Sequence, residues 1–272
     1  MKPTSNCNVV HHHVLNTQLR LVSIITVQQW RTKMKQLEGK TAIITGGGFG
    51  IGKGIAHAFA NEGAKLVIAS RNGQRLKTAA DELRSQGAIV IDVPADVGRE
   101  RDVIALFETT MKKYGRLDIL VNSAGLVDQA PLEQTSLESW QRIIDANLTG
   151  PFLCTREALK IMKPQGGGRI VNIGSISAQM PRPQFAAYSC SKMGLVALTL
   201  TTALEGRDCG IVASCIHPGN VNTAQMELTP NEPAMEIDDI VKAVMAMVTL
   251  PPNVNMIQAI ILPVTQLYLG RG

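Results

Sequence analysis

Tyr188 and Lys192 stand four residues apart and form the most chemically informative pair in the sequence. On a helix this spacing places a phenol and an ammonium on the same face. A free phenol loses its proton at a pH of about 10, and a neighbouring cation favours the charged phenolate. The pair is therefore suited to exchange a proton with the oxygen of an alcohol or a carbonyl group.

Ser175 lies 13 residues before Tyr188, at the end of a predicted strand. A serine hydrolase is the competing interpretation, but it requires a Gly-x-Ser-x-Gly turn and a partner histidine. The sequence contains no such pentapeptide. Beyond residue 35 only His57 and His217 could be that partner, and His57 falls within a predicted helix. Hydrolysis by a nucleophilic serine is therefore disfavoured.

A glycine-rich turn runs from Thr45 to Gly52, directly after the first predicted strand and before a helix. Glycines let a backbone approach phosphates closely, and a helix N-terminus presents free N–H groups to a pyrophosphate. A P-loop is the competing interpretation, but Gly54 follows Lys53 where a hydroxyl residue must bind magnesium. The strict G-x-G-x-x-G pattern is also absent in this register, so neither standard nucleotide motif matches outright.

Ser70 and Arg71 stand about 20 residues past the glycine turn, where an NAD enzyme would place an acidic residue on the ribose. A carboxylate would repel a 2′-phosphate, whereas a guanidinium can bind it, so NADP(H) is favoured over NAD(H). Arg71 could instead be a solvated charge at a helix start. Phe49 offers no second cation in the glycine turn.

Short apolar runs alternate with longer amphipathic stretches from Lys40 onward, which is typical of a doubly wound parallel α/β sheet. Such a sheet binds ligands at the carboxyl ends of its strands. The predicted strands are Thr41–Thr45, Lys65–Ala69, Ile89–Val93, Leu117–Val121, Arg169–Ile173, Ile211–Ile216 and Met256–Leu262. The predicted helices are Ile51–Glu62, Asn72–Gln86, Arg99–Tyr114, Ser136–Met162, Ala186–Glu205 and Ile237–Thr249. We expect residues 36–272 to form a single domain.

The formal net charge of +5 arises entirely within residues 1–35, which contain five Lys or Arg and no Asp or Glu. The remainder is electrically neutral, and aromatic residues make up only 4%, so a nucleic-acid platform is disfavoured. No apolar run is long enough for a membrane span. The five scattered cysteines include no C-x-x-C pair, which argues against disulfides and a zinc site and favours a cytoplasmic location.

The segment 1–35 differs in composition from the rest and contains the run His11 to His13. Acid-poor leaders of this kind include organellar transit peptides, so import remains open. An extension from an upstream start codon, with Met34 the functional one, is the favoured interpretation, and we expect this segment to be disordered.

Four motifs together resemble those of the short-chain dehydrogenases/reductases, over nearly all of residues 38–264. They are Thr-Gly-x-x-x-Gly-x-Gly from Thr45, Asn-Ser-Ala-Gly from Asn122, Tyr-x-x-x-Lys from Tyr188 and Pro-Gly-x-Val-x-Thr from Pro218. The resemblance implies a Rossmann-like seven-stranded sheet and an oxidoreductase that interconverts a small carbonyl compound and its secondary alcohol by hydride transfer. The sequence departs from the family at Ser123, where a second asparagine would brace the backbone.

The resemblance also implies roles for individual residues. Tyr188 would be the acid/base, Ser175 would hold the substrate oxygen, Lys192 would also bind the nicotinamide ribose, and Asn147 would position a water in the proton relay. Asp96 would contact adenine, although an aspartate there could equally cap the next helix. The implied cofactor contacts are Thr45, Gly46, Gly48, Phe49, Gly50, Ile51, Gly52, Ser70, Arg71, Asp96, Val97, Asn122, Ala124, Gly125, Tyr188, Lys192, Pro218, Gly219, Val221 and Thr223.

The identity of the substrate stays open. A short segment, residues 224–236, stands where the family folds a substrate lid, and the tail from Leu250 to Gln266 is similar to the branch that acts on 3-hydroxy acids such as serine. Reduction of 3-oxoacyl thioesters and oxidation of a sugar or polyol are alternatives. By analogy with relatives we expect a homodimer or homotetramer that packs through Arg99–Tyr114 and Ser136–Met162. A nucleotide-binding scaffold without turnover is the alternative class, disfavoured by the intact catalytic set.

Overall fold

The structure is a computed structural model that describes residues 35–223 and 232–267. Contacts between residues divide the chain into residues 1–35 and residues 36–272. Of the predicted leader, residues 1–34 lie outside the described residues. No helix within the described ranges is both long and apolar enough to cross a membrane.

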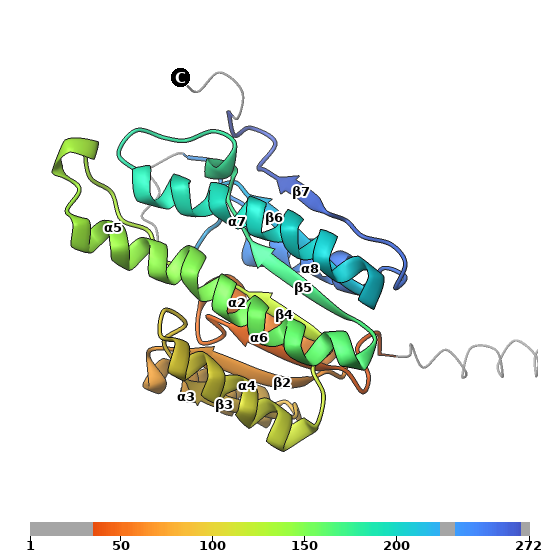
Figure 1. The fold of residues 1–272 in the computed structure, drawn as a ribbon. Coiled ribbons are helices and arrows are strands. Elements are labelled where there is room, and N and C mark those ends of the chain that lie inside the picture. The colour runs from red at the N-terminus through yellow and green to blue at the C-terminus, as the bar shows by residue number, and fades with distance from the viewer. Residues whose placement is uncertain (1–34, 224–231, 268–272) are drawn as a thin grey trace, which may run out of the picture. The chain divides into compact units, whose positions relative to one another are not determined.

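A seven-stranded parallel sheet forms the centre of the unit, with the strand order β3-β2-β1-β4-β5-β6-β7 (Figure 1). This confirms the predicted doubly wound fold. The strands are β1 (Thr41–Thr45), β2 (Lys65–Ser70), β3 (Val90–Pro94), β4 (Ile119–Asn122), β5 (Gly168–Ile173), β6 (Ile211–Pro218) and β7 (Gln258–Ile261). The order reverses between β1 and β4, and at such a point the crossovers diverge and leave a crevice beyond the strand ends.

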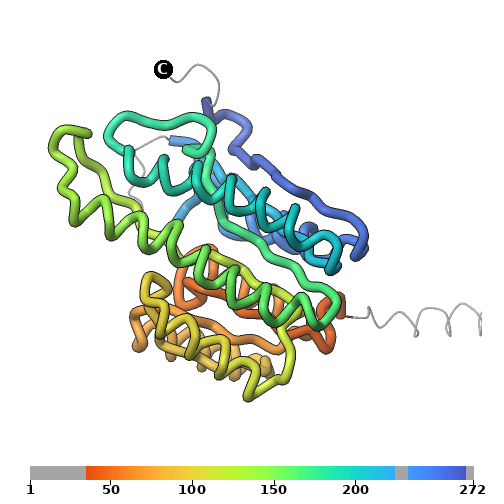
Figure 2. The backbone as a smooth tube through the Cα atoms, viewed as in Figure 1, coloured from red at the N-terminus to blue at the C-terminus, as the bar shows by residue number. Residues whose placement is uncertain are grey.

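Helices cover both faces of the sheet (Figure 2). The α-helices are α2 (Gly50–Asn61), α3 (Gly73–Ser85), α4 (Glu100–Tyr114), α5 (Leu137–Ile144), α6 (Gly150–Gln165), α7 (Ala186–Gly206) and α8 (Ile237–Thr249). Alternate strand residues face opposite ways, so Ile44 packs with α2, α3 and α8 in one core, whereas Ile43 packs with α4 and α6 in the other. Burial on both faces explains the continuous apolar runs of the central strands.

The predicted helix from Ser136 to Met162 is wrong in detail, because a π-helical segment, η2 (Asp145–Thr149), separates α5 from α6. The backbone stays in the right-handed helical region throughout, so the amphipathic pattern continues across the segment and conceals it. Gly150 follows at a tight crossing, where an added Cβ would lie 2.6 Å from the Val97 side chain. Wider π-turns of this kind are frequent at functional sites.

Several predicted strand limits are also wrong by one or two residues. The expected strand Met256–Leu262 is only Gln258–Ile261, because β7 is an edge strand that pairs on one side with the last four residues of β6. The third and fourth strands begin later than expected, at Val90 and Ile119. Near their carboxyl ends the central strands are aligned by the register of the sheet: Thr45 pairs with Asn122, and Asn122 pairs with Asn172.

Arg169 in β5 anchors the end of α8 to the sheet. Its guanidinium donates hydrogen bonds to four main-chain carbonyls, those of Met247, Leu250, Pro251 and Val254, at 2.5 to 3.4 Å. Met247 lies in the last turn of α8 and Leu250 is its C-cap, and a helix C-terminus leaves carbonyls at these positions without intrahelical partners. No carboxylate pairs with Arg169 in the described residues, so its role is to satisfy backbone acceptors.

Arg169→Met should lower the free energy of unfolding by about 1 to 3 kcal/mol, because carbonyls at a partly buried helix end lose their donor. Urea denaturation measures this. Arg101→Met is the control, since the Arg101 side chain is 79% exposed and should change the value by less than about 0.5 kcal/mol. Equal stability of the two variants would contradict the anchoring role.

Candidate active site

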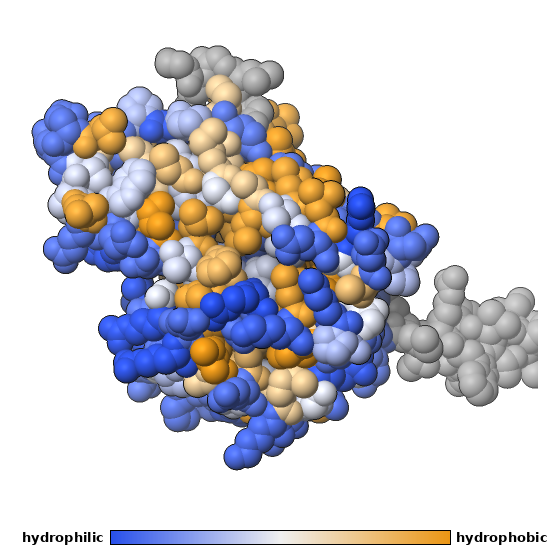
Figure 3. Space-filling model, viewed as in Figure 1, coloured by the Kyte–Doolittle hydropathy of each residue, from blue (hydrophilic) through white to orange (hydrophobic). Residues whose placement is uncertain are grey.

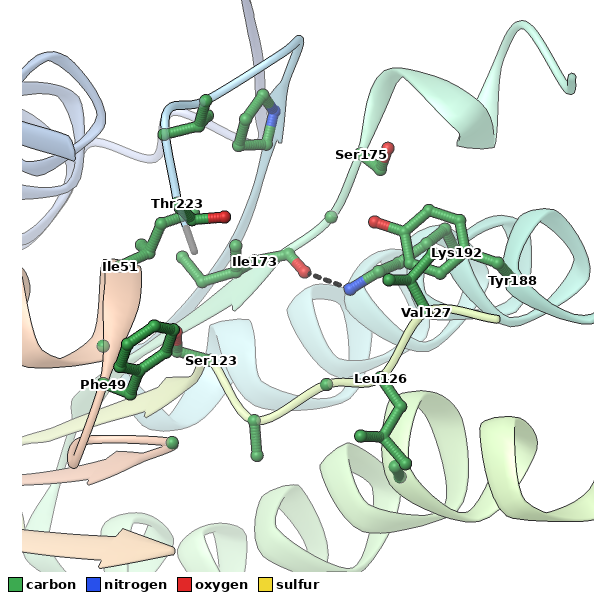
Figure 4. Close-up of a pocket in the computed structure, with 18 of the residues that line it drawn as sticks. Phe49, Ile51, Ser123, Leu126, Val127, Ile173, Ser175, Tyr188, Lys192 and Thr223 are labelled. Atoms are coloured by element: carbon green, nitrogen blue, oxygen red, sulfur yellow. Dashed lines mark hydrogen bonds between the residues drawn. The ribbon is translucent and has the colours of Figure 1, made fainter. Parts of the chain in front are cut away.

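A cavity of about 610 Å³ opens at the carboxyl ends of the strands, where the sheet order predicts a crevice (Figure 4). Its wall takes residues at or just after the ends of six strands: Gly46, Ser70, Ala95, Ser123, Gly174 and Gly219. This volume is in the range of small-molecule and cofactor sites.

Tyr188 and Lys192 lie on the first turns of α7 and both line the cavity. The Lys192 ammonium lies 5.6 Å from the centroid of the Tyr188 ring and is only 6% exposed. It donates a 2.7 Å hydrogen bond to the carbonyl of Ile173 at the end of β5 (Figure 4). It forms no ion pair with a carboxylate of the described residues. The predicted shared helix face is therefore observed, with the cation buried beside the phenol.

Ser175 follows β5 and lines the same cavity. Its hydroxyl oxygen accepts the N–H of Ser177 at 3.1 Å, which leaves the hydroxyl proton free to bond a ligand. Its carbonyl lies 3.1 Å from Nδ1 of His217, a fully buried ring whose Nε2 lies 3.2 Å from the Gln258 side-chain oxygen. Burial lowers the pKa of His217. Because the Ser175 carbonyl oxygen can only accept, His217 donates to it through Nδ1–H and so holds the Ser175 backbone.

Asn147 does not line the cavity, although the sequence places it in the catalytic set. Its side chain lies in the π-helical segment and is fully buried. The Leu126 N–H donates to Asn147 Oδ1 at 2.7 Å, and Asn147 Nδ2 donates to the Leu126 carbonyl at 2.8 Å. Both polar ends of the amide thus brace the loop after β4, and this loop in turn brings Leu126 and Val127 into the wall.

The glycine turn brings its backbone to the cavity. Gly46 adopts a φ of 70°, and an added Cβ would lie 2.9 Å from the Ala124 backbone. At Gly52 a Cβ would lie 2.5 Å from the carbonyl oxygen of Gly46. The helix α2 that follows has no side-chain cap at its N-terminus and no acidic residue in its first turn. Its N-terminal N–H groups are thus suited to bind a phosphate, which fits a bound dinucleotide.

Thr45, Gly50 and Asn122 are predicted cofactor contacts that do not reach the wall. The Thr45 hydroxyl oxygen accepts hydrogen bonds from the N–H groups of Ser123 and Ala124 at 3.1 and 3.2 Å. Thr45 therefore holds the loop after β4 in place, and that loop lines the cavity. Asn122 is buried and donates to Asn172 at 2.8 Å. Every other predicted cofactor contact lines the cavity.

Two arginines occupy the end of the cavity near β2. The predicted Arg71 lines it, and so does Arg75, which lies four residues later in the first turn of α3 and which sequence reasoning missed. The Arg75 guanidinium lies 5.5 Å from the centroid of the Phe49 ring, a cation–π distance. Asp96 also lines the cavity and accepts the Gly98 N–H, so it does not cap α4, whose N-cap is Arg99.

The opposite end is built by the segment after β6. Pro218, Gly219, Val221 and Thr223 line it as predicted, together with Asn220. Gln266 packs so closely against Gly219 that a Cβ there would overlap its side chain. Of the expected lid, residues 224–231 lie outside the described residues, and Met235 pairs with Val221 in a single β-bridge.

In the part of the chain that the structure describes, no three His, Cys, Asp or Glu side chains cluster as metal ligands would.

Comparison with known proteins agrees with this geometry. The family model described as short chain dehydrogenase matches residues 40–233. A 3-oxoacyl-[acyl-carrier-protein] reductase of Synechocystis is 39% identical over 75% of this chain and 83% of its own length. Glucose 1-dehydrogenase 2 of Bacillus subtilis is 41% identical over 70% of this chain and 74% of its own length. A short-chain type dehydrogenase/reductase of Picea abies is 40% identical over 74% of this chain and 77% of its own length.

Gly52→Ala should raise the Kd for NADPH at least about 10-fold, or about 1.4 kcal/mol, because its Cβ would displace the Gly46 carbonyl and open the turn. Titration of NADPH fluorescence measures the Kd. Gly73→Ala is the matched control, since its Cβ would make an ordinary 3.7 Å contact with Pro94. If both variants bound NADPH as the parent does, the turn would not form the phosphate site.

Proposed function

We infer what this chain does from its membership of a known family: it belongs to the short-chain dehydrogenases/reductases. It is therefore an NAD(P)-dependent enzyme that acts on CH–OH groups. We propose that it interconverts a small carbonyl compound and its secondary alcohol with NADP(H), with Tyr188 as acid and base. One observation carries the proposal: the buried Lys192 ammonium lies beside the Tyr188 phenol in the cavity that the glycine turn also lines.

When bound in this cavity, NADPH would supply the hydride that reduces the carbonyl carbon to the alcohol and would leave as NADP⁺. Ser175 donates a hydrogen bond to the carbonyl oxygen and orients it toward Tyr188. Tyr188 donates its hydroxyl proton to that oxygen, and the buried Lys192 ammonium stabilises the resulting phenolate. In oxidation the same groups act in reverse. Asn147 acts as a positioning residue through the Leu126 loop.

Tyr188→Phe should remove at least 99% of turnover, a loss of about 2.7 kcal/mol, because the proton donor is gone while the ring still packs. Its Kd for NADPH should stay within about twofold of the parent value. The rate of NADPH oxidation with a panel of small ketones and fluorescence titration measure the two quantities. Normal turnover in this variant would remove the acid/base assignment.

The proposed preference for NADP(H) rests on two guanidinium groups, Arg71 and Arg75, at the end of the cavity beside Ser70. Phosphate groups bind Arg through charge-assisted and frequently bidentate hydrogen bonds. Ser70 stands at the end of β2, where an NAD enzyme would present a carboxylate. Arg75 supplies the second cation that Phe49 does not.

Arg71→Asp should lower the ratio of kcat/KM for NADPH to kcat/KM for NADH about 100-fold. The reason is that a carboxylate repels the 2′-phosphate of NADPH and accepts hydrogen bonds from the ribose hydroxyls of NADH. Steady-state rates with each nucleotide measure the ratio. Arg101→Asp, an exposed change outside the cavity, should leave the ratio as it is. An unaltered ratio in Arg71→Asp would place recognition of the 2′-phosphate elsewhere.

We also propose a homo-oligomer. The expected contact surface on α4, α5 and α6 exposes Ile104, Leu137 and Phe152. On α7, a row of apolar side chains is 39% to 64% exposed: Met193, Leu200 and Leu204. Apolar side chains gather over α6 and α7 in Figure 3. An exposed apolar face of this kind is typical of a subunit contact.

The substrate class and location are proposals as well. The similarity to a 3-oxoacyl reductase and to a glucose dehydrogenase supports small carbonyl or alcohol substrates without choosing between them. Oxidation of a 3-hydroxy acid remains the second candidate. The cysteines in the described residues are all free, which supports the proposed cytoplasmic location.

A further inference from the structure

Among the described residues, four cationic side chains and one carboxylate line the cavity: Arg71, Arg75, Arg182 and Lys192 against Asp96. The proposed function uses three of these cations. Arg71 and Arg75 face the cofactor end, and Lys192 stands beside Tyr188. Arg182 has no part in the reaction described so far, although it lines the same cavity.

Arg182 lies in the loop that joins the two catalytic hydroxyls, seven residues after Ser175 and six before Tyr188. The loop has a defined shape at this point. The Phe185 N–H donates to the Arg182 carbonyl at 3.3 Å in the turn that starts α7. Gln184 accepts from the Ala130 N–H through its carbonyl at 3.0 Å and from Gln129 through its side chain at 2.7 Å. Arg182 is thus carried by the wall that also carries the acid/base residue.

The half-buried guanidinium is held across the cavity by Asn220, on the segment after β6. Arg182 Nη2 donates to Asn220 Oδ1 at 3.0 Å. Asn220 is itself only 2% exposed and is fixed by Gln266, which accepts its N–H at 2.8 Å and donates to its Oδ1 at 3.3 Å. The guanidinium is therefore oriented before any ligand arrives.

Arg182 makes no ion pair with a carboxylate in the described ranges. The nearest acid in this network, Glu232, accepts from the other end of the amide, Asn220 Nδ2, at 3.4 Å. An arginine has five N–H donors, and the single bond to Asn220 occupies one of them. A purely structural latch would need no charge, because a neutral donor could make the same bond to an amide oxygen.

We propose that Arg182 binds an anionic group of the substrate, a carboxylate or a phosphate, so that the enzyme prefers carbonyl compounds that carry an acidic group near the reacting carbon. This inference rests on the proposed function and specifies its substrate class. Guanidinium groups bind both kinds of anion through paired N–H donors. Arg182 lines the same cavity as Ser175 and Tyr188, so its charge would act as a specificity determinant for the substrate.

The test compares two matched substrate pairs with NADPH: acetoacetate against its methyl ester, and dihydroxyacetone phosphate against dihydroxyacetone. In one of the two pairs, kcat/KM of the parent enzyme should be at least about 10-fold higher for the anion than for its neutral counterpart. The pair that shows this preference identifies the recognised group as a carboxylate or a phosphate. Arg182→Gln should reduce the ratio of anion to neutral substrate about 10- to 100-fold, the effect of losing charge-assisted hydrogen bonds. Arg182→Lys should retain part of the preference.

Arg207→Gln is the control, since Arg207 lies outside the cavity wall at the far end of α7, and its ratios should equal those of the parent. A second readout needs no turnover: malonate or inorganic phosphate should raise the Tm of the parent complex with NADP⁺, but not that of Arg182→Gln. A parent enzyme without preference for either anion, or an undiminished preference in Arg182→Gln, would overturn the inference. If the enzyme reduced only neutral ketones, the inference about Arg182 would fail and the proposed function would stand. If the anion bound in an Arg182-dependent way but was not turned over, only the proposed function would fail.

Discussion

A buried ammonium that has no ion-pair partner among the described residues is the feature on which the proposed site depends. Lys192 is 6% exposed, donates to the Ile173 carbonyl and lies against the face of the Tyr188 ring. The arrangement keeps a positive charge beside the phenol that would exchange the proton in the proposed reaction. The end of β5 and the start of α7 must therefore keep a fixed separation, which the continuous sheet and the close packing of α7 on β6 provide.

The cofactor end depends on a different constraint, close approach of two backbones. The turn after β1 and the loop after β4 touch at Gly46 and Ala124, and Thr45 ties them together through two main-chain N–H groups. Asn147 fixes the same loop further along at Leu126. The two loops thus form one unit, so the glycine turn and the cavity wall at Leu126 are positioned together.

The sequence was sufficient to predict the sheet, its helices and the residues that meet in the cavity, because apolar periodicity and motif spacing are local signals. It did not reveal that the side chains of Thr45 and Asn147 bond to backbone groups of another loop, because only the fold brings those loops together. The π-helical segment was missed because a helical pattern continues through it. Arg75 could have been found, because it lies in the first turn of the predicted helix that begins directly after Arg71. Arg182 could not, because it lies in an irregular loop and its partner Asn220 is 38 residues away in the sequence.

The most direct measurement of the central claim is a double-mutant cycle on Tyr188→Phe and Lys192→Met, with kcat for ketone reduction measured at saturating NADPH. If the ammonium acts through the phenol, the double variant should be no slower than the slower single variant, because the two side chains work as a unit. Losses that multiply in the double variant would show that the two residues act independently, and would contradict the account.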